Sequence, residues 1–116
     1  SVHVFYMTTI INGSGTFNLS NWTSAGSPTN FKVTGFHSIA ADALKNQTTI
    51  QRVHVVLNTD GQNGIINDSA FEGCTSLTSL KITASTNGNS TGINDIREKA
   101  FFNCSSLNYL HYLLIL

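Results

Sequence analysis

The stretch from Ala70 to Ile82, AFEGCTSLTSLKI, decides the fold prediction. Its second half alternates apolar and polar residues, which indicates a short strand that directs Leu80 and Ile82 toward a core. Ala70 and Phe71 predict a short helical turn behind that strand, because the small alanine allows close approach. One such unit cannot cover its own apolar face, so the pattern requires neighbouring copies.

Two further copies of this pattern are present in the chain. Their shared anchor, an alanine followed by a large apolar residue, stands at Ala43, Ala70 and Ala100, with intervals of 27 and 30 residues. These intervals lie near the roughly 20 to 29 residues of leucine-rich repeats. The sequence therefore predicts an α/β repeat solenoid, a short leucine-rich-repeat stack with strands on its concave face and short helical turns behind them. The three predicted units cover residues 36–64, 65–92 and 93–116.

The repeated pattern resembles one known family. Residues 70–82 match Ala-Phe-x-x-Cys-x-x-Leu-x-x-Leu-x-Ile at every position, and residues 100–112 match until Tyr112 replaces the last aliphatic residue. The first unit departs further, with Leu44 for Phe and Gln47 for Cys. This pattern resembles the BspA-like leucine-rich repeats of bacterial and protist surface proteins. The resemblance implies a solenoid fold and a role in adhesion or protein binding.

Residues 1–35 do not fit the repeat. The segment from Val2 to Ile11 is apolar and β-prone, and Asn12-Gly13 opens a turn before Thr16. This arrangement predicts a hairpin. We therefore expect a β-rich N-terminal segment, residues 1–35, packed against the first repeat of residues 36–116, with residues 31–33 as the strand that leads into it.

The composition limits the partners that we expect. Six basic and six acidic side chains cancel, so the chain lacks the field that a nucleic-acid binder normally uses. Ser, Thr and Asn together make up 40 of the 116 residues, which gives an uncharged polar surface. The longest apolar run, Tyr112–Leu116, is far shorter than the roughly 20 residues of a membrane-spanning helix. We predict neither a nucleic-acid partner nor a membrane span.

Glycosylation sequons are more frequent than chance predicts. Seven Asn-x-Ser/Thr triplets occur, against about 3 expected from the composition. They predict N-linked glycans on a protein that is extracellular or displayed at the cell surface. The alternative is that a surface rich in Ser, Thr and Asn produces sequons by composition alone. The candidate sites are Asn12, Asn18, Asn21, Asn67 and Asn89.

Catalytic and metal-binding motifs are not found in the sequence. The chain has no Gly-x-Ser-x-Gly, no phosphate-binding glycine loop and no paired metal-ligand motif, so we predict a protein that is not an enzyme and has no cofactor or metal. Cys74 and Cys104 hold the same repeat position and are predicted to be small buried side chains. A disulfide between them is the alternative, although equivalent side chains in stacked repeats point in parallel.

Two regions are candidates for interaction. Polar and aromatic residues on the outward positions of successive strands form a mildly basic stripe, expected on the concave face, that could bind another surface protein. The alternative is that they are ordinary solvated strand positions. The stripe comprises Arg52, His54, Ser79, Lys81, Tyr109 and His111.

The ends of the chain form the second candidate. They are apolar and uncapped, which predicts head-to-tail contact between copies. We place self-association into a filament or surface array slightly ahead of adhesion through the stripe. The end residues are Val2, Val4, Tyr112, Leu113, Leu114 and Leu116.

Overall fold

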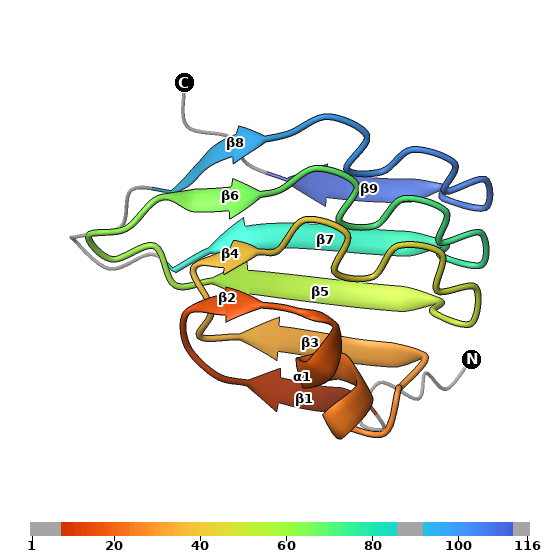
Figure 1. The fold of residues 1–116 in the computed structure, drawn as a ribbon, viewed down its shortest axis with the longest axis horizontal. Coiled ribbons are helices and arrows are strands. Elements are labelled where there is room, and N and C mark those ends of the chain that lie inside the picture. Colours follow the sequence, from red (N-terminus) through yellow and green to blue (C-terminus); the bar gives the residue numbers. More distant parts are fainter. Residues whose placement is uncertain (1–7, 86–91, 113–116) are drawn as a thin grey trace, which may run out of the picture.

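The chain alternates between two parallel sheets. The computed structural model describes residues 8–85 and 92–112. Five strands form sheet A and four form sheet B, and within each sheet the strands follow one another in chain order (Figure 1). Sheet A contains β1 (Thr9–Asn12), β3 (Asn30–Thr34), β5 (Arg52–Leu57), β7 (Ser79–Ala84) and β9 (Tyr109–Tyr112). Sheet B contains β2 (Thr16–Phe17), β4 (Ser38–Ile39), β6 (Gly64–Ile66) and β8 (Ile93–Ile96).

The register of sheet A aligns equivalent residues of successive strands. Val53 of β5 pairs with Leu80 of β7, which pairs with Leu110 of β9. Leu80 and Ile82 are fully buried, so the prediction that both point into the core is confirmed. Apolar side chains from sheet A meet those from sheet B in one continuous core.

The predicted fold class, a repeat solenoid, is wrong. The molecule measures 36 × 31 × 28 Å and is therefore not elongated. Its radius of gyration of 13.3 Å equals the roughly 13 Å that a compact domain of this length has. The structure is a small α/β body of two parallel sheets, and α1 (Leu19–Ser24) is the one helix in residues 8–85 and 92–112.

Tight turns replace the predicted helical turns, because backbone amides there donate hydrogen bonds to carbonyls of the equivalent turn in the following segment. The amide of Leu44 donates to Ala70 O at 2.8 Å, and the amide of Phe71 donates to Ala100 O at 2.8 Å. Each turn also contains two residues with positive φ, such as Ser69 at 59° and Gly73 at 74°. Left-handed residues cannot continue an α-helix, so these segments cross from sheet B to sheet A as tight turns.

The predicted N-terminal hairpin is also wrong. Strand β1 pairs in parallel with β3, and β2 pairs in parallel with β4, so the two strands join different sheets. Helix α1 returns the chain from sheet B to sheet A, and Asn18 caps it by accepting a bond from the amide of Asn21. Buried Trp22 fixes the helix by donating from Nε1 to Pro28 O at 2.9 Å. Both sheets continue across residue 35 without interruption.

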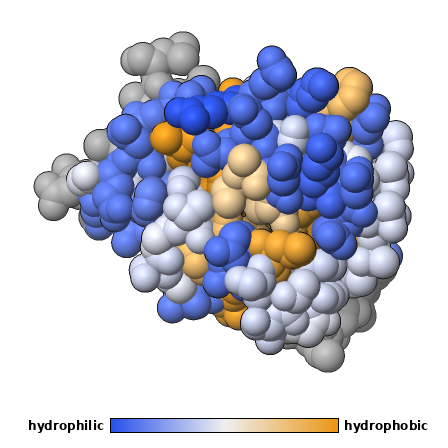
Figure 2. All heavy atoms as spheres, in the orientation of Figure 1, coloured by the Kyte–Doolittle hydropathy of each residue, from blue (hydrophilic) through white to orange (hydrophobic). Residues whose placement is uncertain are grey.

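Polar side chains cover much of the surface. On the face seen in Figure 2, hydrophobic residues are visible near the centre, and hydrophilic residues border them. Inside, Phe17 and Phe36 pack edge to face with their ring centroids 5.4 Å apart. No helix within the described ranges has the length and apolar character needed to cross a membrane.

Candidate functional site

The outer face of sheet A carries the candidate site. Residues along β3, β5 and β7 alternate between buried and partly or fully exposed, so every second side chain faces outward. The pairing places one outward residue from each strand beside the next. We call the resulting line of side chains the cross-strand row, and it comprises Lys32, His54, Lys81 and His111.

A second line of outward residues runs beside the row, one step nearer the start of each strand. It places Arg52 opposite Ser79 and Ser79 opposite Tyr109. All six residues of the stripe identified in the sequence therefore lie on three adjacent strands of one sheet. The structure brings them together as one surface, and it adds Asn30 and Lys32 from β3.

Charge is segregated between this face and the rest of the molecule. Three of the six basic residues, Lys32, Arg52 and Lys81, lie on strands of sheet A. The ion pair shown within the described ranges joins Arg97 to Asp95 at 2.9 Å, outside sheet A. The three cations on the face therefore have no carboxylate partner within residues 8–85 and 92–112. All six acidic residues lie off these strands: Asp42, Asp60, Asp68, Glu72, Asp95 and Glu98.

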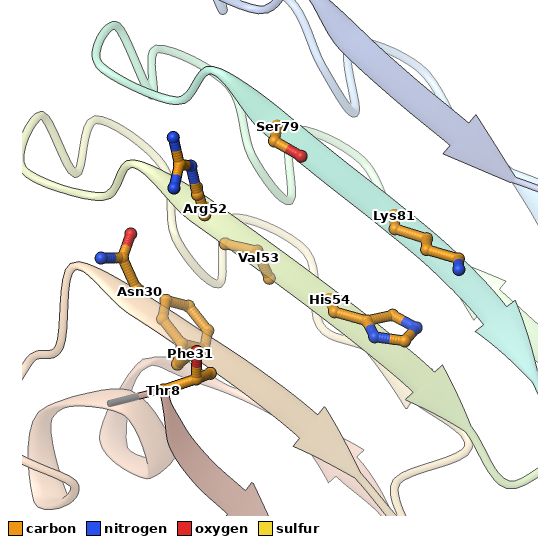
Figure 3. Close-up of a pocket in the computed structure, with 8 residues that line it drawn as sticks. All are labelled: Thr8, Asn30, Phe31, Arg52, Val53, His54, Ser79 and Lys81. Atoms are coloured by element: carbon orange, nitrogen blue, oxygen red, sulfur yellow. The ribbon is translucent and has the colours of Figure 1, made fainter. Parts of the chain in front are cut away.

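A shallow hollow of about 150 Å³ lies between β3, β5 and β7. Its lining includes amide, hydroxyl and cationic side chains, and it contains no acidic side chain. In Figure 3 the His54 ring and the Lys81 side chain extend in the same direction along neighbouring strands, whereas Arg52 lies nearer the start of β5. The buried Oδ1 of Asn30, which lines the same hollow, has no hydrogen-bond partner among the residues that the structure describes.

The pKa of His54 reflects both its partial burial and the positive charges around the hollow. Partial burial is the largest cause that lowers its pKa below 6.5, and the positive charges of Lys81 and Lys32 lower it further. Its Nε2 lies 3.3 Å from Oγ1 of Thr83, which holds the ring over β7. His54 is therefore neutral at pH 7, and a bound anion would favour its protonation.

An aromatic pair lies at the β9 end of this face. Tyr109 is 48% exposed, and its ring is nearly parallel to that of His111, with 11° between the planes and 6.5 Å between the centroids. Both belong to an edge strand that pairs with β7. The face thus combines a cationic centre with an exposed aromatic border.

Sequence reasoning did not include Asn30 and Lys32 in the site. Residues 31–33 were identified as a strand, but they were assigned to the N-terminal segment and not aligned with the repeats. The alternation of Phe31, Lys32 and Val33 was the available signal, since it matches Val53, His54 and Val55.

Most of the candidate self-association residues lie outside the part of the chain that the structure describes. Val2, Val4, Leu113, Leu114 and Leu116 lie outside the described residues. Tyr112 lies on β9, is 44% exposed and packs near Phe101, with 6.4 Å between the ring centroids. The structure therefore places one of the six at an exposed sheet edge.

The sequon asparagines occupy different environments. Asn12 and Asn18 are exposed, and their side-chain oxygens accept hydrogen bonds from the Thr34 hydroxyl on β3 and from the Asn21 amide in α1, respectively. Asn21 is half-buried in α1. Asn67 is half-buried, and its Nδ2 donates to Ile39 O at 2.8 Å, so it is poorly placed for a glycan. Asn89 lies outside the described residues.

The two cysteines are free thiols that bond the backbone of the preceding segment. Sγ of Cys74 donates to Leu44 O at 3.2 Å, and Sγ of Cys104 donates to Phe71 O at 3.1 Å. Burial raises the pKa of Cys74 to about 12, and burial also raises the pKa of Cys104. The raised pKa values disfavour the reactive thiolate form at both positions, and most strongly at Cys74. Among the described residues no group of three or more His, Cys, Asp or Glu side chains is placed to hold a metal ion.

Comparisons of the chain with family models, with curated proteins and with solved structures found no match. The likeness to BspA-like repeats therefore remains a resemblance in sequence pattern. Two features of the molecule suggest a function: the outer face of sheet A and the exposed edge at β9.

Proposed function

We propose that the protein is a non-catalytic interaction module that acts outside the cell and binds a negatively charged partner through the outer face of sheet A. The segregation of charge carries this proposal. A chain with no net charge places Lys32, Arg52 and Lys81 on one sheet and none of its acidic residues there. Unpaired cations on a common face attract anions and raise their local concentration.

The excess of sequons supports an extracellular location. Asn12 and Asn18 are exposed and lie toward the β1 side of the molecule, so glycans there would leave β5, β7 and β9 uncovered. A glycosidase-sensitive mass of the native protein would support this part of the proposal, and a native mass equal to that of the bare chain would contradict it.

The main test compares two double variants that remove the same charge. Lys32→Gln with Lys81→Gln neutralises the face, whereas Lys45→Gln with Lys99→Gln neutralises two cations that lie off sheet A. Binding is measured by fluorescence anisotropy to a panel of labelled polyanions that differ in backbone and share the same number of charges. We expect the face variant to bind at least about tenfold more weakly than the control variant.

Equal losses in the two variants would show that net charge, and not the face, determines binding. A wild-type protein that binds no polyanion at low salt would overturn the proposal directly. Circular dichroism of both variants verifies that they are folded, and the solvent-facing side chains make this outcome the expected one.

Self-association is a second candidate function, favoured by the exposure of β9. All four residues of this strand are exposed, although their partners Leu80 and Ile82 in β7 are fully buried. Leu110 is 40% exposed, so a sheet edge and apolar side chains are presented together. Contact of β9 with a second copy of the chain would bury the sheet edge and its apolar side chains.

Negative-stain electron microscopy over a range of concentrations tests this second function. Regular filaments or rings that Leu110→Asp abolishes would support it, and Val56→Asp on the outer face of β5 serves as the matched control. Dispersed single particles at every concentration would contradict it. Both functions involve β9, but Lys32→Gln with Lys81→Gln leaves the residues of β9 unchanged, so this variant separates anion binding from self-association.

A further inference from the structure

The cross-strand row has a regular spacing that a linear ligand can follow. Its four members come from four adjacent strands of a parallel sheet, in register. Neighbouring strands are about 4.8 Å apart, so the row advances by that distance at each step and spans roughly 14 Å. A ligand that matches the row is therefore linear, runs across the strands and carries repeated negative charges.

We propose that this ligand is an acidic polysaccharide whose sugars carry sulfate or carboxylate groups. This inference rests on the proposed function and names the ligand of the same face. A pyranose in a linear chain advances by about one strand spacing, and roughly alternate sugars turn the same side to a surface, so anionic groups two sugars apart match Lys32 and Lys81, which are two strands apart. Lys32 and Lys81 neutralise those groups, and His54 lies between them.

The aromatic pair at β9 favours a sugar over a peptide. Tyr109 is 48% exposed and nearly parallel to His111, directly beside the end of the row. Exposed aromatic faces pack against the C–H groups of sugar rings, and such rings are rigid, so little conformational freedom is lost on binding. A carbohydrate chain can lie over the cations and end on this pair.

The polar groups of the hollow fit hydroxyl-rich ligands. Thr8, Asn30 and Ser79 line the hollow of about 150 Å³ with amide and hydroxyl groups, and the hydroxyl of Thr83 contacts His54 beside it. Within residues 8–85 and 92–112 the buried Oδ1 of Asn30 has no partner, so a small rotation of its side chain toward the hollow would let it accept a bond from a ligand hydroxyl. Carbohydrates supply such hydroxyl donors on every ring.

An acidic peptide fits this face less well. Extended peptides bind sheets mainly by adding a strand to an edge, where backbone groups are unpaired. The backbone groups of β3, β5 and β7 already bond to neighbouring strands on both sides. The face therefore presents side chains alone, and a peptide would find no backbone partners there.

Binding should tighten as the pH falls below 6.5. The groups that face His54 are Lys32 and Lys81 on the neighbouring strands, Arg52 on its own strand and the hydroxyl of Thr83. Burial first, and then the positive charges of Lys81 and Lys32, lower the pKa of His54 and keep it neutral in the free protein. An anion over the row offsets those charges, so protonation of His54 and binding favour each other.

The experiment measures fluorescence anisotropy with three labelled oligomers of matched charge: a heparin-derived oligosaccharide, an oligogalacturonate and an oligoglutamate. We expect at least one of the two glycans to bind at least about tenfold more tightly than the peptide, and the glycan that binds identifies sulfate or carboxylate as the recognised group. Tyr109→Ser should weaken glycan binding severalfold, whereas Phe102→Ser, which removes an equally exposed aromatic ring off the face, should not.

The outcomes separate this inference from the proposed function. Equal binding of peptide and glycans, with a loss in Lys32→Gln plus Lys81→Gln, would retain the anion-binding face and overturn the polysaccharide. A Tyr109→Ser variant that binds glycans as well as the wild type does would also overturn it. A His54→Gln variant with the same pH dependence of binding as the wild type would remove His54 from the site. Folding of each variant is verified by its urea midpoint.

Discussion

The single variants Leu80→Ala and Leu110→Ala, at paired positions of β7 and β9, test whether the side chain of Leu110 is exposed to solvent. Leu80 and Leu110 occupy the same register position on β7 and β9, but Leu80 is 0% exposed and Leu110 is 40% exposed. Truncation of a fully buried leucine removes its transfer free energy and leaves a cavity, which together cost about 3–5 kcal/mol. At Leu110 part of the side chain already contacts solvent and no closed cavity forms, so we expect a cost of about 1 kcal/mol.

Urea denaturation at low protein concentration, followed by circular dichroism, gives both free energies of unfolding. The expected difference of about 2–4 kcal/mol between Leu80→Ala and Leu110→Ala is well above the error of linear extrapolation. Equal destabilisation by the two variants would refute the reasoning, because it would mean that Leu110 is covered in solution. A cost at Leu110 that grows with protein concentration would identify a second copy as the cover.

The remaining predictions concern backbone strain, titration and thiol reactivity. Gly35 and Gly61 both have positive φ, but a Cβ on Gly35 would strike the backbone carbonyl of Gly13 while Gly61 faces open space, so Gly35→Ala should cost about 2 kcal/mol or more in urea unfolding and Gly61→Ala about 1 kcal/mol; equal costs would contradict the close contact. The pKa of His54 is lowered by burial first and by neighbouring lysines second, so the unfolded chain binds more protons between that lowered pKa and 6.5. Stability should therefore decrease as the pH is lowered through this window, and the decrease should be smaller in His54→Gln; identical pH profiles would disprove the shift. Native alkylation near pH 8, about where free thiols react, should label half-buried Cys104 before Cys74, whose pKa is about 12. Mass spectrometry of proteolytic peptides at successive times identifies the labelled residue, and earlier labelling of Cys74 would contradict the prediction.

Strand positions and their outward faces could be predicted from the sequence. Period-two alternation is a local signal, so Leu80 and Ile82 were assigned to the core and His54 and Lys81 to the surface without knowledge of the fold. The repeat spacing then aligned β5, β7 and β9, which located most of the candidate site. The charge segregation itself follows from this alignment, because no acidic residue occurs in those strands.

Sheet B and the turns could not be predicted in the same way. Strands β2 and β4 have two residues each, too few to show a period, and they exist because they pair with neighbours. The turn at Ala70 resembles a helical start, yet its amides bond to the next segment and Ser69 is left-handed. Such bonding depends on distant residues, and the local sequence contains no signal for it.

The N-terminal error has a related cause. Phe31 precedes its partner Val53 by 22 residues, whereas the anchors Ala43, Ala70 and Ala100 are 27 and 30 residues apart, so Phe31–Val33 was not aligned with β5. Asn12-Gly13 was interpreted as a hairpin turn, but the chain there passes from one sheet to the other. The omission of Lys32 from the site follows from this misalignment.

The uneven distribution of charge makes a neutral molecule an electric dipole. A body without net charge experiences no net force in a uniform field, but it experiences a torque when its cations and anions occupy different sides. Near a negatively charged surface the protein would rotate until Lys32, Arg52 and Lys81 face that surface, before any contact forms. The torque acts only within about one Debye length, roughly 8 Å in physiological salt, so orientation and docking occur almost together. Such a molecule would not be drawn in from afar, yet it would arrive at close range already aligned.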